Sequence, residues 1–188
     1  MRWKTTAVIS VSAILLTGRA DAQSLDENRE RCTNATPDIA ILACTAIIGS
    51  GQMAAEDLAG AFNNLGVAYA GRRESDRAIE NYDRALRLNP NNAAAFNNRG
   101  VAYLDKREYD RAIQDFDQAI KLDPNYALAF SNRGVAYAGK AEYDRAIENY
   151  RQARKLNPNG AVDFYLHNLS TQKLGEVASG TRKIAGPE

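Results

Sequence analysis

Asparagine side chains recur along this chain every 34 residues, at Asn64, Asn98 and Asn132. An asparagine amide both donates and accepts hydrogen bonds, so a row of such amides can bind the backbone of an extended peptide with little regard to its sequence. An alternative is that the asparagines only solvate their surface or brace neighbouring helices, because repeated identity can also reflect recent duplication. The elements that carry these asparagines must therefore decide between the two interpretations.

Residue types that support catalysis are scarce. The chain has one histidine, His167, and two cysteines. It contains no Ser-His-Asp set, no HExxH, no phosphate-binding glycine loop and no CxxC. A lone histidine without a nucleophile or a metal partner is more typical of a structural residue. We therefore expect no enzymatic activity, no metal site and no cofactor.

Length and composition are those of an ordinary globular domain. The 188 residues are 45% hydrophobic and 25% charged, with a formal net charge of +1. A chain of this length can bury a hydrophobic core. Lysine and arginine are interleaved with aspartate and glutamate, with no basic run, which argues against a nucleic-acid partner or an anionic membrane surface.

The N-terminus has the features of a secretory signal peptide. Arg2 and Lys4 form a short positive start, Thr5–Thr17 is mostly apolar, and Ala20-Asp21-Ala22 has the small-x-small pattern of a cleavage site. A retained membrane anchor is the alternative, but a spanning helix needs roughly 20 apolar residues. We predict that residues 1–22 are removed, which places the mature protein in the periplasm or outside the cell, with no membrane insertion after cleavage.

The two cysteines agree with export. Cys32 and Cys44 are 12 positions apart, and an oxidising compartment allows such a pair to form a disulfide. Closing a loop of this size stabilises a fold by about 3 kcal/mol in the chain-entropy model. Two buried free thiols are the alternative.

The asparagines lie in a unit that occurs three times without a gap, at residues 59–92, 93–126 and 127–160. Of its 34 positions, 17 are identical in all three copies. In the second copy, apolar periodicity predicts helices at Ala93–Asp105 and Asp110–Leu122, and Pro124 ends the second one. A helical pair of this length cannot bury its apolar face alone, so it must stack on its neighbours into a rod with a concave side.

Glycines in each copy predict two further features. Gly71 and Gly139 follow the first helix, where a left-handed cap favours glycine. A second set lies in the middle of the first helices, where glycine costs about 1 kcal/mol against alanine, so it indicates a close helix–helix approach. We expect these glycines to face alanines of the second helices: Gly66, Gly100 and Gly134 against Ala78, Ala112 and Ala146.

The shared pattern resembles the tetratricopeptide repeat across residues 59–160. In the first copy it reads Phe62-x-x-Leu65-Gly66-x-x-Tyr69, then Ala78-x-x-x-Tyr82, then Pro90. The resemblance implies an all-α fold, a right-handed α-solenoid of three helix hairpins. We expect a degenerate N-terminal hairpin carrying the disulfide at residues 23–58, a capping helix at 161–174 and a disordered tail at 175–188.

In this family the first helix of each hairpin lines the concave face. The resemblance therefore implies a peptide-binding groove formed by Asn63, Asn64, Val67, Asn97, Asn98, Val101, Ser131, Asn132 and Val135. A different groove of the family holds a C-terminal carboxylate with lysine, asparagine and arginine. Only Asn98 fits that pattern, so we do not expect that subclass.

Arg99 and Arg133 depart from the family, which more often has leucine there. Their long stems can pack while the charged heads reach solvent, or they can reach into the groove.

The sequence thus predicts a non-enzymatic protein–protein interaction module outside the cytoplasm. Its partner would be a protein or an extended peptide bound in the concave groove. The alternative is a structural or oligomerising scaffold of an envelope assembly, and the sequence leaves a homo-oligomer open.

Overall fold

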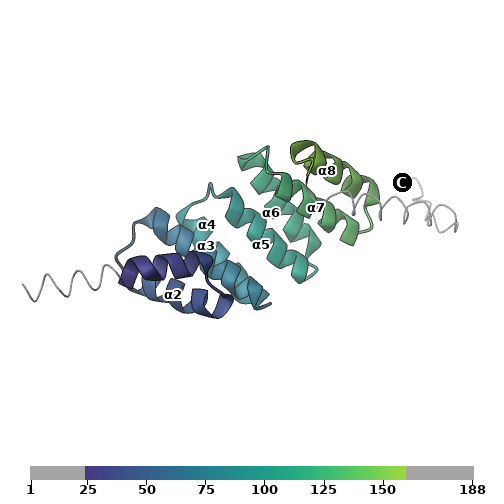
Figure 1. The fold of residues 1–188 in the computed structure, drawn as a ribbon. Helices are drawn as coiled ribbons and strands as arrows, with labels where there is room; N and C mark the ends of the chain where they lie inside the picture. Colours follow the sequence, from purple (N-terminus) through teal and green to yellow (C-terminus); the bar gives the residue numbers. More distant parts are fainter. Residues whose placement is uncertain (1–23, 160–188) are drawn as a thin grey trace, which may run out of the picture.

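The computed structural model describes residues 24–159, and Figure 1 shows that this part of the chain is built of helices. After a helix at residues 24–34, the elements are α2 (Pro37–Gly49), α3 (Ala55–Gly71), α4 (Ser75–Leu88), α5 (Ala93–Asp105), α6 (Tyr109–Leu122), α7 (Ala127–Gly139) and α8 (Tyr143–Leu156). The predicted signal peptide, capping helix and C-terminal tail lie outside the described residues.

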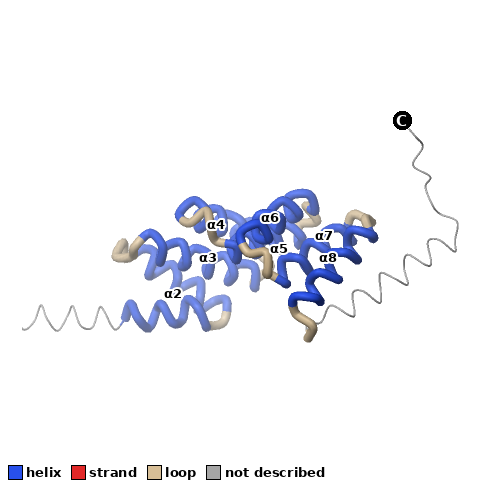
Figure 2. Tube along the Cα trace, turned by 90° about the horizontal axis from the view of Figure 1, so that it is seen from above, coloured by secondary structure: helices blue, strands red, loops and turns tan. Residues whose placement is uncertain are grey.

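The helices pair into hairpins that stack side by side. Within the repeats, α3 contacts α4, α5 contacts α6 and α7 contacts α8, while α5 also contacts both α3 and α7. Figure 2 shows the resulting arc, with α2 near one end and α8 near the other. Because the first helices touch one another across repeats, they lie on the inner, concave side. The predicted all-α solenoid is confirmed.

The second helix of each repeat ends where the sequence predicts. Asn89, Asp123 and Asn157 leave the helix with φ between −132° and −137° and ψ between 88° and 94°. Each of them precedes a proline, and proline disfavours helical backbone in the residue before it. The amide of each still donates to the carbonyl four residues back, as from Asn89 to Ala85 at 2.8 Å. The proline therefore sets the end of the helix.

The prediction that Gly71 and Gly139 are left-handed is wrong. The left-handed residue lies two positions later in each repeat and is not glycine: Arg73 (φ 61°), Arg107 (φ 60°) and Ala141 (φ 59°). Gly139 instead makes room, since a Cβ there would lie 2.5 Å from Cε1 of Tyr109. The glycine signal reflects packing between hairpins and not the conformation of the turn.

The mid-helix glycines do permit the predicted close approach, but against a different partner. A Cβ at Gly100 would lie 2.6 Å from the ring of Phe116. Tyr82 and Tyr150 occupy the same place beside the other two glycines. Aromatic rings of the second helices, and not the predicted alanines, therefore fill the space that these glycines leave.

The predicted disulfide is present and joins the 24–34 helix to α2. The Cys32 and Cys44 sulfurs are 2.05 Å apart and the Cα atoms 4.7 Å apart. Both cysteines are buried in an apolar cluster with Ile47 of α2 and with Ala61 and Leu65 of α3. The disulfide thus belongs to the core that anchors the first repeat.

Candidate functional site: the concave face

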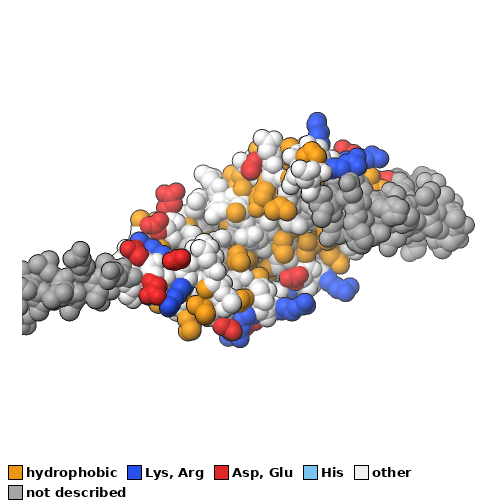
Figure 3. Space-filling model, in the orientation of Figure 1, with side chains coloured by type: hydrophobic (Ala, Val, Ile, Leu, Met, Phe, Trp, Pro, Cys, Tyr) orange, Lys and Arg blue, Asp and Glu red, His pale blue; other side chains and the backbone are white. Residues whose placement is uncertain are grey.

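The inner side of the arc exposes a line of aliphatic side chains. Val67 is 48% exposed and Leu128 62% exposed, and the equivalent Val101 and Val135 are half-buried. Figure 3 shows hydrophobic side chains gathered over α5 and α7, with charged side chains around the rim of the same face. Apolar surface in the middle of a concave face with a polar rim is typical of a binding surface.

Four of the predicted groove asparagines bond to one another across three helices. Asn132 of α7 donates from Nδ2 to Oδ1 of Asn97 at 2.9 Å. Asn97 donates to Oδ1 of its neighbour Asn98 at 3.5 Å. Asn98 donates to Oδ1 of Asn63 in α3 at 3.2 Å. We call this set of four residues the amide ladder.

The members of the amide ladder differ in how far they are buried. Asn97 is only 5% exposed, with both its amide oxygen and its amide nitrogen bonded to neighbours. The structure thus places it as a brace between helices, and the predicted groove contact at this residue is not available. Asn63, Asn98 and Asn132 are half-buried. An amide has two donor hydrogens and two acceptor lone pairs, so each of these retains capacity for a ligand.

The remaining predicted groove residues lie beside the amide ladder. Asn64 donates to Oγ1 of Thr33 at 3.3 Å, which links α3 to the 24–34 helix. Ser131 is half-buried on α7. The nine predicted residues thus lie on the first helices of the three repeats, where Val67 is the most exposed of them and Asn97 is buried.

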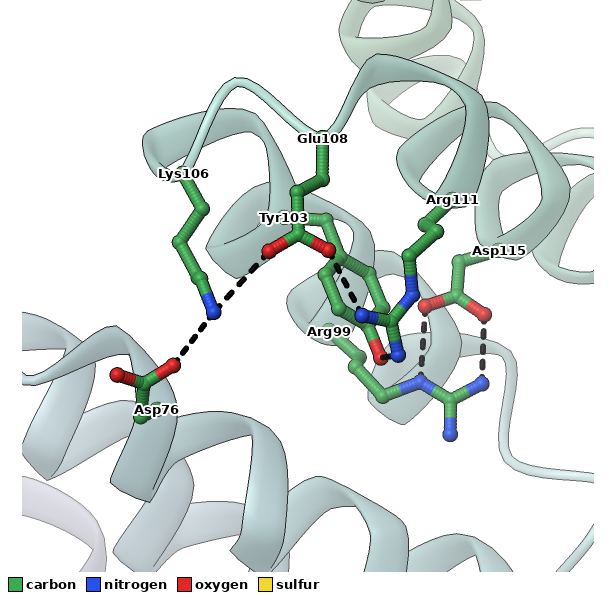
Figure 4. Close-up of polar contacts among 7 residues, drawn as sticks. All are labelled: Asp76, Arg99, Tyr103, Lys106, Glu108, Arg111 and Asp115. Carbon is green, nitrogen blue, oxygen red and sulfur yellow. Dashed lines mark hydrogen bonds and ion pairs between the residues drawn. The ribbon is translucent and has the colours of Figure 1, made fainter.

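Arg99 directs its guanidinium to carboxylates of the second helices, with 20% of its side chain exposed, and not into the groove or fully into solvent as the sequence suggested. It holds Asp115 in α6 with two hydrogen bonds, from Nε at 2.8 Å and from Nη2 at 2.6 Å (Figure 4). Its Nη1 donates to Asp83 of the preceding hairpin at 2.6 Å. The hydrogen bonds to Asp115 raise the pKa of Arg99 above its ordinary value. Arg99 is thus a structural cation that ties two hairpins together.

Asp115 has only 6% of its side chain exposed. Burial raises the pKa of this carboxyl above its ordinary value, although the hydrogen bonds from Arg99 act in the opposite direction. The ion pair is therefore what makes a charged Asp115 tolerable in this position.

Arg133 repeats the arrangement one hairpin further along. Its Nε donates to Oδ1 of Asn149 at 2.7 Å, and Nη1 pairs with Asp117 of the preceding hairpin. The signal that could have revealed both networks is a polar partner 16 positions after each arginine. The second helices are rich in charged residues, so this polar partner does not stand out in the sequence.

A second row of ion pairs links successive hairpins. Lys106 bonds to Asp76 of the preceding hairpin at 2.6 Å and to Glu108 at 3.0 Å (Figure 4). These contacts raise the pKa of the lysine, with Asp76 the larger cause. Lys140 pairs with Asp110 at 2.6 Å in the same way. Exposed pairs of this kind contribute little stability each, but they repeat with the fold.

Arg111 covers the ring of Tyr103, with its guanidinium carbon 4.1 Å from the ring centre. Its Nη2 also donates to the tyrosine hydroxyl at 2.7 Å, as Figure 4 shows. Tyr103, which is 4% exposed, is therefore part of the packing of its hairpin.

Two kinds of feature are absent from the described part of the chain. Between residues 24 and 159, no group of three or more histidine, cysteine, aspartate or glutamate side chains is placed to bind a metal ion. None of the helices described there combines the length and the apolar character needed to cross a membrane.

Family models for the tetratricopeptide repeat match residues 63–127 and 127–159, which is more than half of the chain. Together with the stacked hairpins and the concave face, this shows that the chain belongs to the tetratricopeptide repeat family. No curated protein sequence matches the chain.

Solved tetratricopeptide repeat domains have similar folds. The first such domain of human RPAP3 is 25% identical, with a TM-score of 0.64, and the match covers 66% of this chain and 98% of the RPAP3 domain. The second domain of human RPAP3, in complex with the HSP70 peptide SGPTIEEVD, is 28% identical, with a TM-score of 0.60 and coverages of 62% and 98%. The Sgt2 domain of Aspergillus fumigatus is also 28% identical, with a TM-score of 0.61 and coverages of 69% and 87%.

Proposed function

We propose that this protein is a non-enzymatic interaction module that binds an extended peptide segment of a partner protein on its concave face. The observation that carries the proposal is the exposed aliphatic line of Val67 and Leu128 beside half-buried amides on one face. Aliphatic surface can take apolar side chains of a peptide, and amides with spare capacity can bond to its backbone. The structurally similar RPAP3 domain is itself solved with a peptide bound.

We further propose that this interaction takes place outside the cytoplasm, in the periplasm or after secretion. The disulfide between Cys32 and Cys44 supports this location, because structural disulfides persist in oxidising compartments. The signal-peptide pattern of residues 1–22 is the second support. Intact mass and N-terminal sequencing of the exported protein test this part.

Binding to a library of nine-residue synthetic peptides tests the concave face. We expect Asn98→Ala to bind the peptides selected by wild type more weakly, because it removes a ligand contact and two bonds of the amide ladder. The loss of these two hydrogen bonds should cost only about 1–2 kcal/mol of stability. Asn91→Ala is the matched control, since Asn91 is an exposed asparagine between α4 and α5. Unchanged affinity in Asn64→Ala, Asn98→Ala and Asn132→Ala would refute the proposal.

A scaffold role is the second candidate, and one observation favours it. Ile39 and Leu42 of α2 are 46% and 72% exposed, which leaves an apolar stripe on the N-terminal hairpin. Such a stripe can mediate self-association. Size-exclusion chromatography with light scattering separates the candidates, because a scaffold assembles without a peptide and Leu42→Ser would return it to a monomer.

A further inference from the structure

A cavity of about 320 Å³ lies at the N-terminal end of the concave face, between the 24–34 helix and α3. Gly60 and Asn64 of α3 form part of its wall, so it opens beside the asparagines described above. Ile47 and Ala61, 2% and 5% exposed, give it an apolar floor. An extended peptide on the concave face would therefore meet this cavity at the end of its path.

Gly60 is what leaves the cavity open. A Cβ at this position would meet no atom within 4 Å. The equivalent position carries Ala94 in the second repeat and Leu128 in the third, and Leu128 is 62% exposed. The first repeat thus has space where the third has a large side chain, and the backbone accepts either.

The rim of the cavity has an excess of negative charge. Glu56 and Asp57, in the first turn of α3, and Arg29 all line it. Arg29 already pairs with Asp26 at 3.3 Å, whereas neither Glu56 nor Asp57 forms a salt bridge within the described residues. The positive end of the α3 dipole supplies roughly half a unit charge, which is not enough to offset two carboxylates.

We propose that this cavity binds a lysine or arginine side chain of the partner peptide, an inference that rests on the proposed function. The aliphatic stem of such a residue would pack on the apolar floor and its cationic head would reach the carboxylates at the rim. A shorter apolar side chain would leave the carboxylates without a counter-charge, and an acidic one would be repelled. The cavity thus selects for charge, while the aliphatic line on the concave face selects for apolar residues.

The test is a nine-residue peptide library in which each position is fixed in turn as lysine, arginine, leucine or glutamate. We expect wild type to enrich a basic residue at one position. That preference should weaken between 50 mM and 300 mM salt, because exposed charges are screened. If the basic side chain forms two exposed ion pairs, wild type should bind peptides with that residue about fivefold more tightly than peptides with leucine there.

Two variants remove the preference by different routes. Glu56→Gln with Asp57→Asn removes the charges with little change of shape. Gly60→Leu fills the cavity with the residue type that the third repeat carries at this position, and a Cβ there would meet no atom within 4 Å. Glu80→Gln with Glu148→Gln is the control, because it removes two exposed carboxylates from α4 and α8, outside the cavity.

The result expected is loss of the basic preference in both cavity variants and not in the control, with apolar selection retained in all three proteins. Peptide binding without a basic preference in wild type, or with one that survives both cavity variants, overturns the cavity proposal and leaves the proposed function standing. Absence of any peptide binding by wild type overturns both. Circular dichroism of each variant confirms that the fold is intact.

Discussion

Leu65 and Arg99 occupy the same position in successive repeats but are buried by opposite kinds of contact. Leu65 is 7% exposed and packs in the apolar cluster around the disulfide. The Arg99 side chain, 20% exposed, lies between Asp83 of one hairpin and Asp115 of its own. One position in the backbone thus accepts either an apolar core residue or the centre of an ion network.

The neighbour on the second helix decides whether the arginine is required. Sixteen positions after Leu65 stands Asn81, whose Nδ2 donates to the carbonyl of Arg77 at 2.8 Å and needs no cation. Sixteen positions after Arg99 stands Asp115, a carboxylate that does need one. A buried charge is costly unless it is paired. The third repeat combines Arg133 with Asn149, so asparagine on the second helix accepts either leucine or arginine on the first. The comparison teaches that the arginine is required only where its second-helix partner is an aspartate.

The largest effect on stability is expected in the apolar cluster that contains Leu65 and the disulfide. Reduction of Cys32–Cys44, or Cys32→Ser with Cys44→Ser, should lower the free energy of unfolding by about 3 kcal/mol. Thermal melting with and without reductant measures the loss. The chain has only two cysteines, so the double variant must be insensitive to reductant. An unchanged melting temperature would show that the hairpin holds without the bond.

The next effect is expected in the ion network. Arg99→Leu leaves the Asp115 carboxylate buried without its cation, and should cost about 2 kcal/mol, less than for a fully buried pair because Arg99 is partly exposed. Adding Asp115→Asn recreates the Leu65–Asn81 pair of the first repeat and should restore most of the loss. Urea unfolding of both variants measures this. A double variant no more stable than the single one would refute the idea that the Asp115 carboxylate is what makes the arginine necessary.

The smallest effect is a pH dependence of that loss. Burial raises the pKa of Asp115, and Arg99→Leu removes the group that opposes the shift. A carboxyl with a raised folded-state pKa binds its proton more tightly in the folded state, so its stabilisation is complete below the unfolded pKa of about 4 and is lost as pH rises through the folded pKa. The deficit of Arg99→Leu should therefore grow as the pH rises from 4 to 7, and urea unfolding across this range measures it. The double variant, which lacks the carboxyl, should show no such trend.

Local signals in the sequence were sufficient for the helices of the repeat and for the ends of its second helices. Apolar periodicity placed α5 at Ala93–Asp105, as observed, and proline marked the end of each second helix. The all-α solenoid followed from the repeat itself, because such a unit must stack to bury its apolar face. The cysteine pair was predictable from its spacing and the expected compartment.

Contacts between repeats were harder to predict. The spacing marked Asn97 as equivalent to Asn63, but Asn97 is buried between two other amides. Arg99 was expected to reach solvent or the groove, and its carboxylate partners lie 16 positions away on either side. Side chains so far apart in the chain meet only after the hairpins have stacked, so no local pattern specifies them.

By itself, the sequence determined a stack of helix hairpins with a concave side lined by asparagines and valines, since period and turn residues are local properties of the chain. Only the tertiary structure decided which of these amides are used up as braces, which remain open, and where a cavity is left beside Gly60. The physical reason is that burial, hydrogen-bond partners and empty volume depend on distances between repeats, and these are fixed only when neighbouring hairpins pack.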